Sequence, residues 1–297
     1  MLVNNFNKHI HQIWFQKYDS PHKPGTIVNE DYISCKKMYT DFAERKGWGY
    51  TLWDENSVDD LIKEHFPTYL DKFNSIDSII KKVDCARYMI LYVFGGLYVD
   101  VDSYPKRDLD DFLNIESIIR DDYPYTAWHI APEYEITHGY DLVVGQEKTV
   151  YEYHYNKFGL VIPKLNNAVI FAAPKLRVFL DLIEIGFKRI NNSILNSFGV
   201  HTFSMVLYQE MNKFIEDMLT VDNYNGDSKI LTLPTVYFYE TDVDLEDYEY
   251  WGGKPEHKHS PLQFIVHKYM GDWDDNSYGH FLINELKGEK LDGSGSL

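Results

Sequence analysis

Along the N-terminal part of the chain, segments with hydrophobic residues at helical spacing alternate with segments that have the spacing of strands. Apolar positions predict a long helix from about Ile76 to Phe94, and a buried strand follows almost at once from Leu97. Cap and turn residues bound the elements before it. The elements expected there are a strand at 9–15, a helix from Asn29 to Lys46, a strand at 49–53 and a helix that begins at Ser57 and ends or bends at Pro67. This order indicates an α/β fold with a largely parallel sheet.

The second half of the chain has weaker patterning. Asn166 to Ala172 is typical of a buried strand, and Pro174 suits the first turn of a following helix. Residues 131–160 are polar, acidic and tyrosine-rich without a clear period, which predicts an insertion or a loop region. The other expected elements are a strand at 126–130, helices at about 175–190 and 202–219, strands at 230–233 and 236–239, and a last strand at 262–267. No linker divides the chain, so we expect one domain over residues 1–290 and a flexible tail at 291–297.

Composition and charge narrow the classes of function. The chain has 297 residues, 44% of them hydrophobic, and a formal net charge of −17. It can therefore bury a sizeable core, while nucleic acid and anionic membranes are disfavoured as general partners. Only two cysteines, Cys35 and Cys85, argue against a disulfide framework or a cysteine zinc site. A polar N-terminus and the lack of a run of ~18 apolar residues predict no signal peptide, no transmembrane segment and a cytoplasmic location.

The segment after the long helix carries the candidate chemistry. Gly95 stands where a helix-ending residue with positive φ is expected. Side chains alternate along a strand, so Tyr98, Asp100 and Asp102 are expected on one face. Two carboxylates about 7 Å apart on such a face repel each other unless a cation or a hydrogen-bond network lies between them. A hard divalent cation that also binds phosphate oxygens would fill this place.

Three further polar residues extend this candidate site. Asp84 and Arg87 are three residues apart and therefore neighbours on one face of the long helix. They form either a simple intrahelical ion pair or a pair in which Arg87 reaches a phosphate and Asp84 a hydroxyl group, and their spacing does not decide between the two. His267 ends the last expected strand. An imidazole joined to two carboxylates suits manganese.

The string Arg87–Tyr92 followed by Gly95–Asp102 resembles the sugar-binding region that contains the DXD motif. This region is the signature of glycosyltransferase family 32, which includes α-mannosyltransferases, α-1,4-galactosyltransferases and capsular polysaccharide glycosyltransferases. The string is also similar to the catalytic domain of clostridial glucosylating toxins. His11–Phe15 resembles the first strand of the family, Asn166–Ala168 an inner strand, and His267–Trp273 the closing segment. The matches follow the order of the family along the chain.

The resemblance implies a GT-A (Rossmann-like) fold with a mixed, mostly parallel central sheet flanked by helices. It also implies a nucleotide-sugar donor and Mn²⁺ or Mg²⁺ as cofactor. The chain departs from the family at Gly199–His201, where many members have a T-G-P-like turn, and at Asp272, where serine is common. The acceptor side is therefore the less defined part of the expected site.

The resemblance also implies three groups of site residues. The implied metal ligands are Asp100, Asp102 and His267. At the nucleoside, the resemblance implies contacts from Ile13 and Trp14 to the nucleobase, from Tyr98 to the ribose or base, and from Asp100 to the ribose. At the donor sugar, it implies contacts from Asp84, Arg87 and Asn167 (or Asn166). The implied phosphate contacts are Arg87 and, at the β-phosphate, Trp273. The implied catalytic residues are Asp100, Asp102, Arg87 and Asn167.

The expected activity is metal-dependent, retaining transfer of a hexose from GDP-mannose or a UDP-sugar to a glycan, lipid-linked or protein acceptor, as in polysaccharide biosynthesis. Two alternatives belong to other classes. Leu97–Ser103 also resembles the first motif of haloacid-dehalogenase-like phosphohydrolases, and Gly271–Asp275 faintly resembles their last motif. A catalytically silent sugar-nucleotide-binding protein would carry the same residues, so turnover of a sugar donor separates it from an enzyme.

Overall fold

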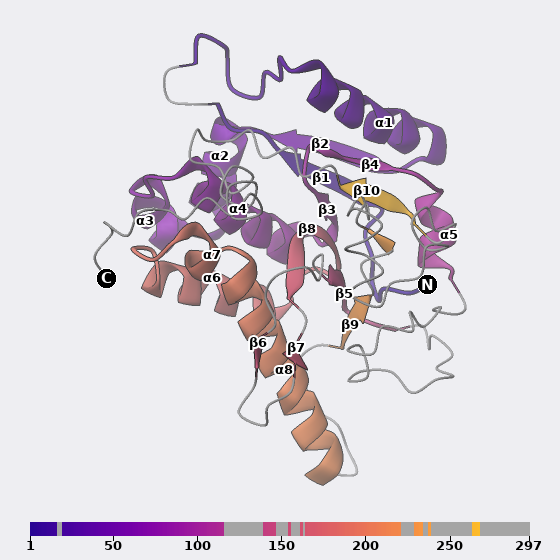
Figure 1. Ribbon diagram of the computed structural model, residues 1–297. Coiled ribbons are helices and arrows are strands. Elements are labelled where there is room, and N and C mark those ends of the chain that lie inside the picture. Colours follow the sequence, from indigo (N-terminus) through magenta and orange to yellow (C-terminus); the bar gives the residue numbers. More distant parts are fainter. Residues whose placement is uncertain are drawn as a thin grey trace, which may run out of the picture. The chain divides into compact units, whose positions relative to one another are not determined.

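The computed structural model describes residues 1–16, 20–115, 139–146, 154–155, 161–162, 164–220, 229–233, 237–238 and 263–267 (Figure 1). All of these lie within one compact unit that spans residues 1–267. The expected strand at 126–130, Trp273 and the tail at 291–297 lie outside the described residues. The single domain over residues 1–290 stays a prediction.

A six-stranded sheet forms the centre of the described unit, in the order β2-β1-β3-β8-β5-β9. β1 runs parallel to β2 and β3, and β5 runs parallel to β9, whereas β8 is antiparallel to both β3 and β5. The strands are β1 (His9–Ile13), β2 (Gly49–Trp53), β3 (Gly96–Val99), β5 (Leu142–Gln146), β8 (Leu165–Ala172) and β9 (Ile230–Leu233). A mixed, mostly parallel sheet flanked by helices confirms the expected α/β class and the arrangement expected of a GT-A fold.

Two shorter strand pairs lie outside this sheet. β4 (Ser103–Pro105) pairs antiparallel with β10 (Ile265–His267), and β6 (His154–Tyr155) pairs antiparallel with β7 (Val161–Ile162). β10 is shorter than the last strand expected from the sequence. Tyr237 and Phe238, which were expected in a strand, form a turn instead, and the Tyr237 carbonyl accepts a hydrogen bond from the Phe264 backbone amide at 2.9 Å.

Caps set the bounds of the first helices. The Asn29 side chain accepts from the Asp31 amide at the start of α1 (Glu30–Lys46), and Gly47 ends the helix at φ 69°. α2 (Glu55–His65) begins before the expected Ser57, because Asp54 and Ser57 form a capping box. Ser78 caps α4 (Ile79–Phe94), so the long helix starts three residues later than its apolar pattern suggested.

Two of the remaining helices are long, and the others span three to five residues each. α6 (Arg177–Lys188) and α8 (Val200–Thr220) confirm the two expected helices of the second half. The others are η1 (Pro67–Tyr69), α3 (Leu70–Asn74), α5 (Leu109–Leu113) and α7 (Ile194–Ser197). No helix among the described residues combines the length and the apolar character needed to cross a membrane. A cytoplasmic location stays a prediction.

The two faces of the sheet pack against different helices. Ile13 on β1 and Tyr98 on β3 belong to the hydrophobic cluster that also contains the inner sides of α4 and α6. Alternation turns Leu97 and Val99, both fully buried, toward the opposite face. Figure 1 shows α1 on one side of the sheet and α4, α6 and α7 on the other.

The strand β5 overturns one expectation. Residues 131–160 were expected to form an insertion or a loop, but Leu142–Gln146 is an inner strand between β8 and β9. Leu142, Val143 and Val144 are fully buried. Their apolar run is too short to establish a period, and polar residues surround it, so its burial depends on the neighbouring strands.

A buried histidine holds the diglycine turn between α4 and β3 against β1. Gly95 and Gly96 both have positive φ, and a Cβ on Gly96 would lie 2.6 Å from the His9 carbonyl oxygen. His11 Nδ1 lies 3.1 Å from the Trp53 indole nitrogen, which can only donate, so His11 Nε2–H donates to the Gly95 carbonyl at 3.1 Å. Burial lowers the pKa of His11 to about 3, with a further contribution from His9. His11 is therefore neutral in the folded chain.

Because His11 is neutral in the folded chain, we expect the free energy of unfolding to decrease in mild acid. The unfolded chain takes up a proton at His11 below its ordinary pKa of 6.5, so the stabilising effect is complete above that pH and declines as the pH falls toward 3. Between pH 7 and 5 the wild type should lose about 2 kcal/mol more of its unfolding free energy than His11→Gln. Urea denaturation at both pH values measures this. His22→Gln, at an exposed histidine, should keep the wild-type pH dependence, and equal losses in His11→Gln and the wild type would contradict the prediction.

Candidate functional site

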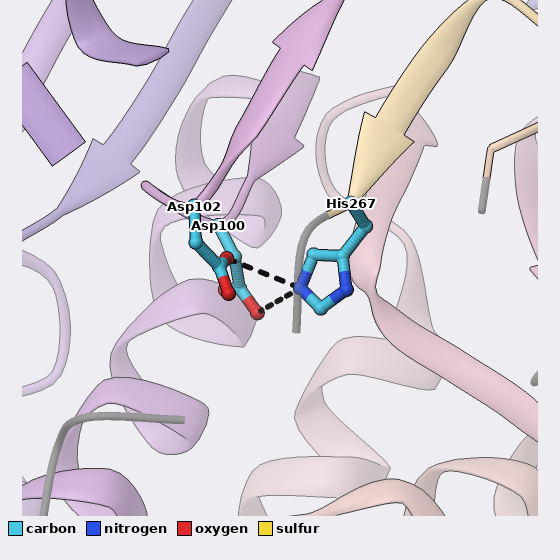
Figure 2. A group of neighbouring side chains, drawn as sticks. All are labelled: Asp100, Asp102 and His267. Atoms are coloured by element: carbon cyan, nitrogen blue, oxygen red, sulfur yellow. Dashed lines mark ion pairs between the residues drawn. The ribbon is translucent and has the colours of Figure 1, made fainter. Parts of the chain in front are cut away.

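Two carboxylates and one imidazole converge at the end of β3 and β10. His267 Nε2 lies 3.1 Å from an Asp102 carboxylate oxygen and 3.6 Å from one of Asp100 (Figure 2). One ligand atom from each of these residues lies within 4.8 Å of the others. Asp102 and His267 are each only 6% exposed, whereas the Asp100 side chain is 25% exposed. Carboxylate oxygens and an imidazole nitrogen form a donor set that fits Mn²⁺ or Mg²⁺.

A turn, rather than a strand face, brings the two aspartates together. β3 ends at Val99, and the Ser103 amide donates to the Asp100 carbonyl at 3.1 Å. The expectation that Asp100 and Asp102 lie on one face of a strand is therefore wrong, although both carboxylates still meet. Strand alternation could not reveal this, because the sequence gives no sign that the apolar Val101 belongs to a turn.

The β4–β10 pair brings the third residue to the site. His267 is paired with Ser103 across the two strands, so its ring lies beside the turn that carries the aspartates. Burial lowers the pKa of His267, but the adjacent Asp102 and Asp100 outweigh this and raise its pKa to about 10. In the absence of a cation, the imidazolium offsets the repulsion between the carboxylates.

Arg87 connects the aspartate turn with α4 and β8. Its guanidinium donates to the Asn167 carbonyl at 2.6 Å and lies 2.8 Å from Asp84 and 3.4 Å from Asp100. It also lies 4.6 Å from the centre of the Tyr98 ring, and the Tyr98 hydroxyl donates to Asp100 at 2.6 Å. Arg87 therefore forms the intrahelical ion pair and also reaches the candidate metal site.

Asp84 and Asn167 form the inner wall of this network. The Asn167 amide donates to Asp84 at 3.2 Å and to the Tyr88 hydroxyl at 3.0 Å. Burial raises the pKa of Asp84 to about 6, against the opposing effect of Arg87. The neighbouring Asn166 instead accepts from the Ala168 amide at 2.6 Å. Of the two expected asparagines, Asn167 is thus the one joined to Arg87 and Asp84.

Gln12 is a site residue that the sequence reasoning missed. Its fully buried amide donates to the Asp100 carbonyl at 3.3 Å and accepts from the Tyr50 hydroxyl at 2.8 Å. Ser103 Oγ donates to the same carbonyl at 2.6 Å and lies 3.2 Å from the Tyr39 hydroxyl. The available signal was a polar residue inside a buried strand, because a fully buried amide needs partners.

The two residues expected at the nucleobase lie where β1 ends. Ile13 is buried in the core, whereas Trp14 is half-buried and its indole nitrogen donates to the Thr26 carbonyl at 3.0 Å. The Trp14 ring centre lies 5.1 Å from that of Tyr32. Trp273, expected at the β-phosphate, lies outside the described residues.

The charges of the network leave room for a divalent cation. Asp84, Asp100 and Asp102 carry three negative charges when ionised, and Arg87 supplies one positive charge. A divalent cation would neutralise the remaining two charges with His267 as a neutral ligand. The arrangement can therefore hold a hard cation at the partly exposed Asp100 carboxylate, which Arg87 contacts.

Comparisons with known proteins gave a family match for one segment of the chain and structural neighbours of low similarity. Residues 26–122 match the family described as "Glycosyltransferase sugar-binding region containing DXD motif", and this segment includes Asp84, Arg87, Asp100 and Asp102. A solved structure of mouse xyloside xylosyltransferase 1 aligns over 89% of this chain and 98% of its own, with 10% identity and a TM-score of 0.43.

Three curated relatives match parts of the chain. Inositol phosphoceramide mannosyltransferase 1 of Schizosaccharomyces pombe is 32% identical over 37% of this chain and 32% of its own length. An uncharacterized glycosyltransferase of Acanthamoeba polyphaga mimivirus is 32% identical over 36% and 39%. Mannosyl phosphorylinositol ceramide synthase CSH1 of Saccharomyces cerevisiae is 37% identical over 30% and 22%. The matched segments thus span well under half of the length of each relative. Residues 26–122 thus carry a DXD-containing sugar-binding region like that of glycosyltransferases, and its aspartates lie beside Arg87 and His267.

Proposed function

We propose that this chain transfers a hexose from a nucleotide-sugar donor to a glycan, lipid-linked or protein acceptor, with a divalent cation held by Asp100, Asp102 and His267. The convergence of these three residues beside Arg87 is the observation that carries the proposal. The cation, Mn²⁺ or Mg²⁺, would supply positive charge opposite the diphosphate leaving group. Transfer with retention of the anomeric configuration is the outcome expected of the family.

The other residues of the site would bind and orient the donor. The Arg87 side chain is only 5% exposed, and its guanidinium would hold Asp100 and Asn167 in place. Asp84 and Asn167 would accept and donate hydrogen bonds at the donor sugar. Trp14, half-buried at the end of β1, would stack on the nucleobase, and Ile13 would contact the base through its backbone.

The names of two relatives favour mannose as the transferred sugar. Both the S. pombe and the S. cerevisiae proteins are named for a mannosyl group. GDP-mannose is therefore the first donor to test, with UDP-galactose, UDP-glucose and UDP-N-acetylglucosamine beside it. Release of the nucleoside diphosphate with Mn²⁺, and none with a chelator present, would support the proposal. Release of phosphate from simple phosphomonoesters without turnover of any sugar donor would overturn it in favour of a phosphohydrolase.

Gln12 offers a test of how the site is held. Gln12→Met keeps the shape of the side chain but removes its hydrogen bonds to the Asp100 carbonyl and the Tyr50 hydroxyl. Because groups behind a metal ligand orient it, the dissociation constant for Mn²⁺ should rise about 10- to 100-fold. Calorimetric titration of Mn²⁺ measures this directly. Tyr50→Phe removes one of the two hydrogen bonds and should give a smaller rise, while an unchanged constant in Gln12→Met would contradict the role.

A further inference from the structure

A carboxylate oxygen without a partner lies next to the segment that follows β1. Glu55 is the first residue of α2, and its Oε1 accepts a hydrogen bond from the Gln16 backbone amide. Its Oε2 is buried and has no hydrogen-bond partner among the described residues. Asp54, directly before it, is already used as the helix cap through Ser57. A buried acceptor left unsatisfied is costly, so an N–H group of a ligand that reaches Oε2 would gain a hydrogen bond that the chain itself does not supply.

The topology brings this carboxylate to the donor side of the sheet. β2, β1 and β3 are neighbouring parallel strands, and Glu55, Trp14 and Asp100 follow their respective carboxyl ends. Trp14 is hydrogen-bonded to the end of β2, because its backbone amide donates to the Trp53 carbonyl at 2.9 Å. Ligands of open α/β sheets bind outside the carboxyl ends of the strands. A donor whose diphosphate lies at Asp100 and whose base stacks on Trp14 would therefore bring the edge of that base toward Glu55.

A carboxylate distinguishes the nucleobases by their donor patterns. Guanine presents two adjacent donors, its ring N1–H and its 2-amino group, which match the two oxygens of a carboxylate. Uracil presents one donor, N3–H, flanked by two carbonyl oxygens that a carboxylate repels. Oε1 can accept a second hydrogen bond because each carboxylate oxygen has two lone-pair sites. We propose that Glu55 recognises the base of the donor and makes this enzyme specific for guanosine diphosphate sugars, an inference that rests on the proposed function.

An isosteric substitution tests the proposal through binding rather than turnover. Glu55→Gln keeps an oxygen for the Gln16 amide but turns the unpartnered acceptor into a donor. In the presence of Mn²⁺, wild-type chain should bind GDP about tenfold more tightly than UDP, since a hydrogen bond to a charged group is worth about that factor. Glu55→Gln should lose that preference, with weaker GDP binding and equal or tighter UDP binding. Isothermal titration with GDP and UDP measures all four affinities.

The controls separate this inference from the proposed function. Glu64→Gln removes an exposed carboxylate of the same helix and should bind both nucleotides as the wild type does. Thermal unfolding of Glu55→Gln shows whether the chain is folded, and Glu55→Asp, which keeps the charge but shortens its reach, should also weaken GDP selectively. Tighter binding of UDP than GDP by the wild type, or an unchanged preference in both Glu55 variants, would overturn the role of Glu55. Failure of the wild type to bind either nucleotide with Mn²⁺ would instead overturn the proposed function.

Discussion

Asp102→Asn should abolish metal-dependent turnover of the sugar donor while the chain remains folded. Asparagine keeps the shape of the side chain but removes a negative charge next to His267, which lies 3.1 Å away. Without the Asp102 carboxylate, a divalent cation would lose a charged ligand. The positive charge that the cation would supply opposite the leaving group would then also be lost. We expect kcat to fall by about a hundredfold or more, measured as release of nucleoside diphosphate from the donor.

The acidic segment after β4 supplies the matched control for this experiment. Asp111 is an exposed carboxylate in the first turn of α5, so Asp111→Asn removes the same charge away from the three candidate ligands. Its turnover and Mn²⁺ affinity should equal those of the wild type. Full activity in Asp102→Asn, with a normal cooperative unfolding transition, would show that the metal assignment is wrong.

Arg87→Met should destabilise the chain strongly, by about 3–5 kcal/mol of unfolding free energy, because it leaves buried carboxylates without their cation. The Arg87 and Asp84 side chains are only 5% and 6% exposed, and Arg87 also holds the Asn167 carbonyl. Equilibrium unfolding in urea measures the loss. The double variant Asp84→Asn/Arg87→Met removes both members of the pair and should recover part of it.

An exposed ion pair shows what burial adds. Arg177 and Asp181 form a pair on α6 with side chains that are 59% and 27% exposed. Arg177→Met should cost less than about 1 kcal/mol, since solvent screens such a pair. Similar losses in Arg177→Met and Arg87→Met would mean that the Arg87 network does not act as a buried unit.

Local patterns were sufficient to predict α4 and β3, but not the turn that carries the two aspartates. The apolar spacing of α4, the glycines after it and the strand at Leu97 were all present in the sequence, and the structure has them with small shifts at the helix starts. Helix starts shifted because capping depends on which of several polar residues reaches a backbone amide. Asp54, for example, caps α2 where Ser57 was expected to begin it.

The parts that could not be predicted depend on neighbours distant in sequence. β5 is buried only because β8 and β9 lie on either side of it. The same holds for Gln12, whose importance comes from the Asp100 carbonyl at 3.3 Å and not from its own strand. The resemblance to the family indicated that His267 belongs with the aspartates, but only the pairing of β10 with β4 explains how it reaches them.

That pairing also sets the order in which the site can be assembled. The segment that matches the family, residues 26–122, contains both aspartates but not the imidazole, which lies on the last described strand. During synthesis, the N-terminal parts of a chain become available for folding first. A ribosome-bound chain that ends before β10 thus holds the carboxylate pair without the third candidate ligand. A metal site built from these three residues would therefore form only in chains that include β10.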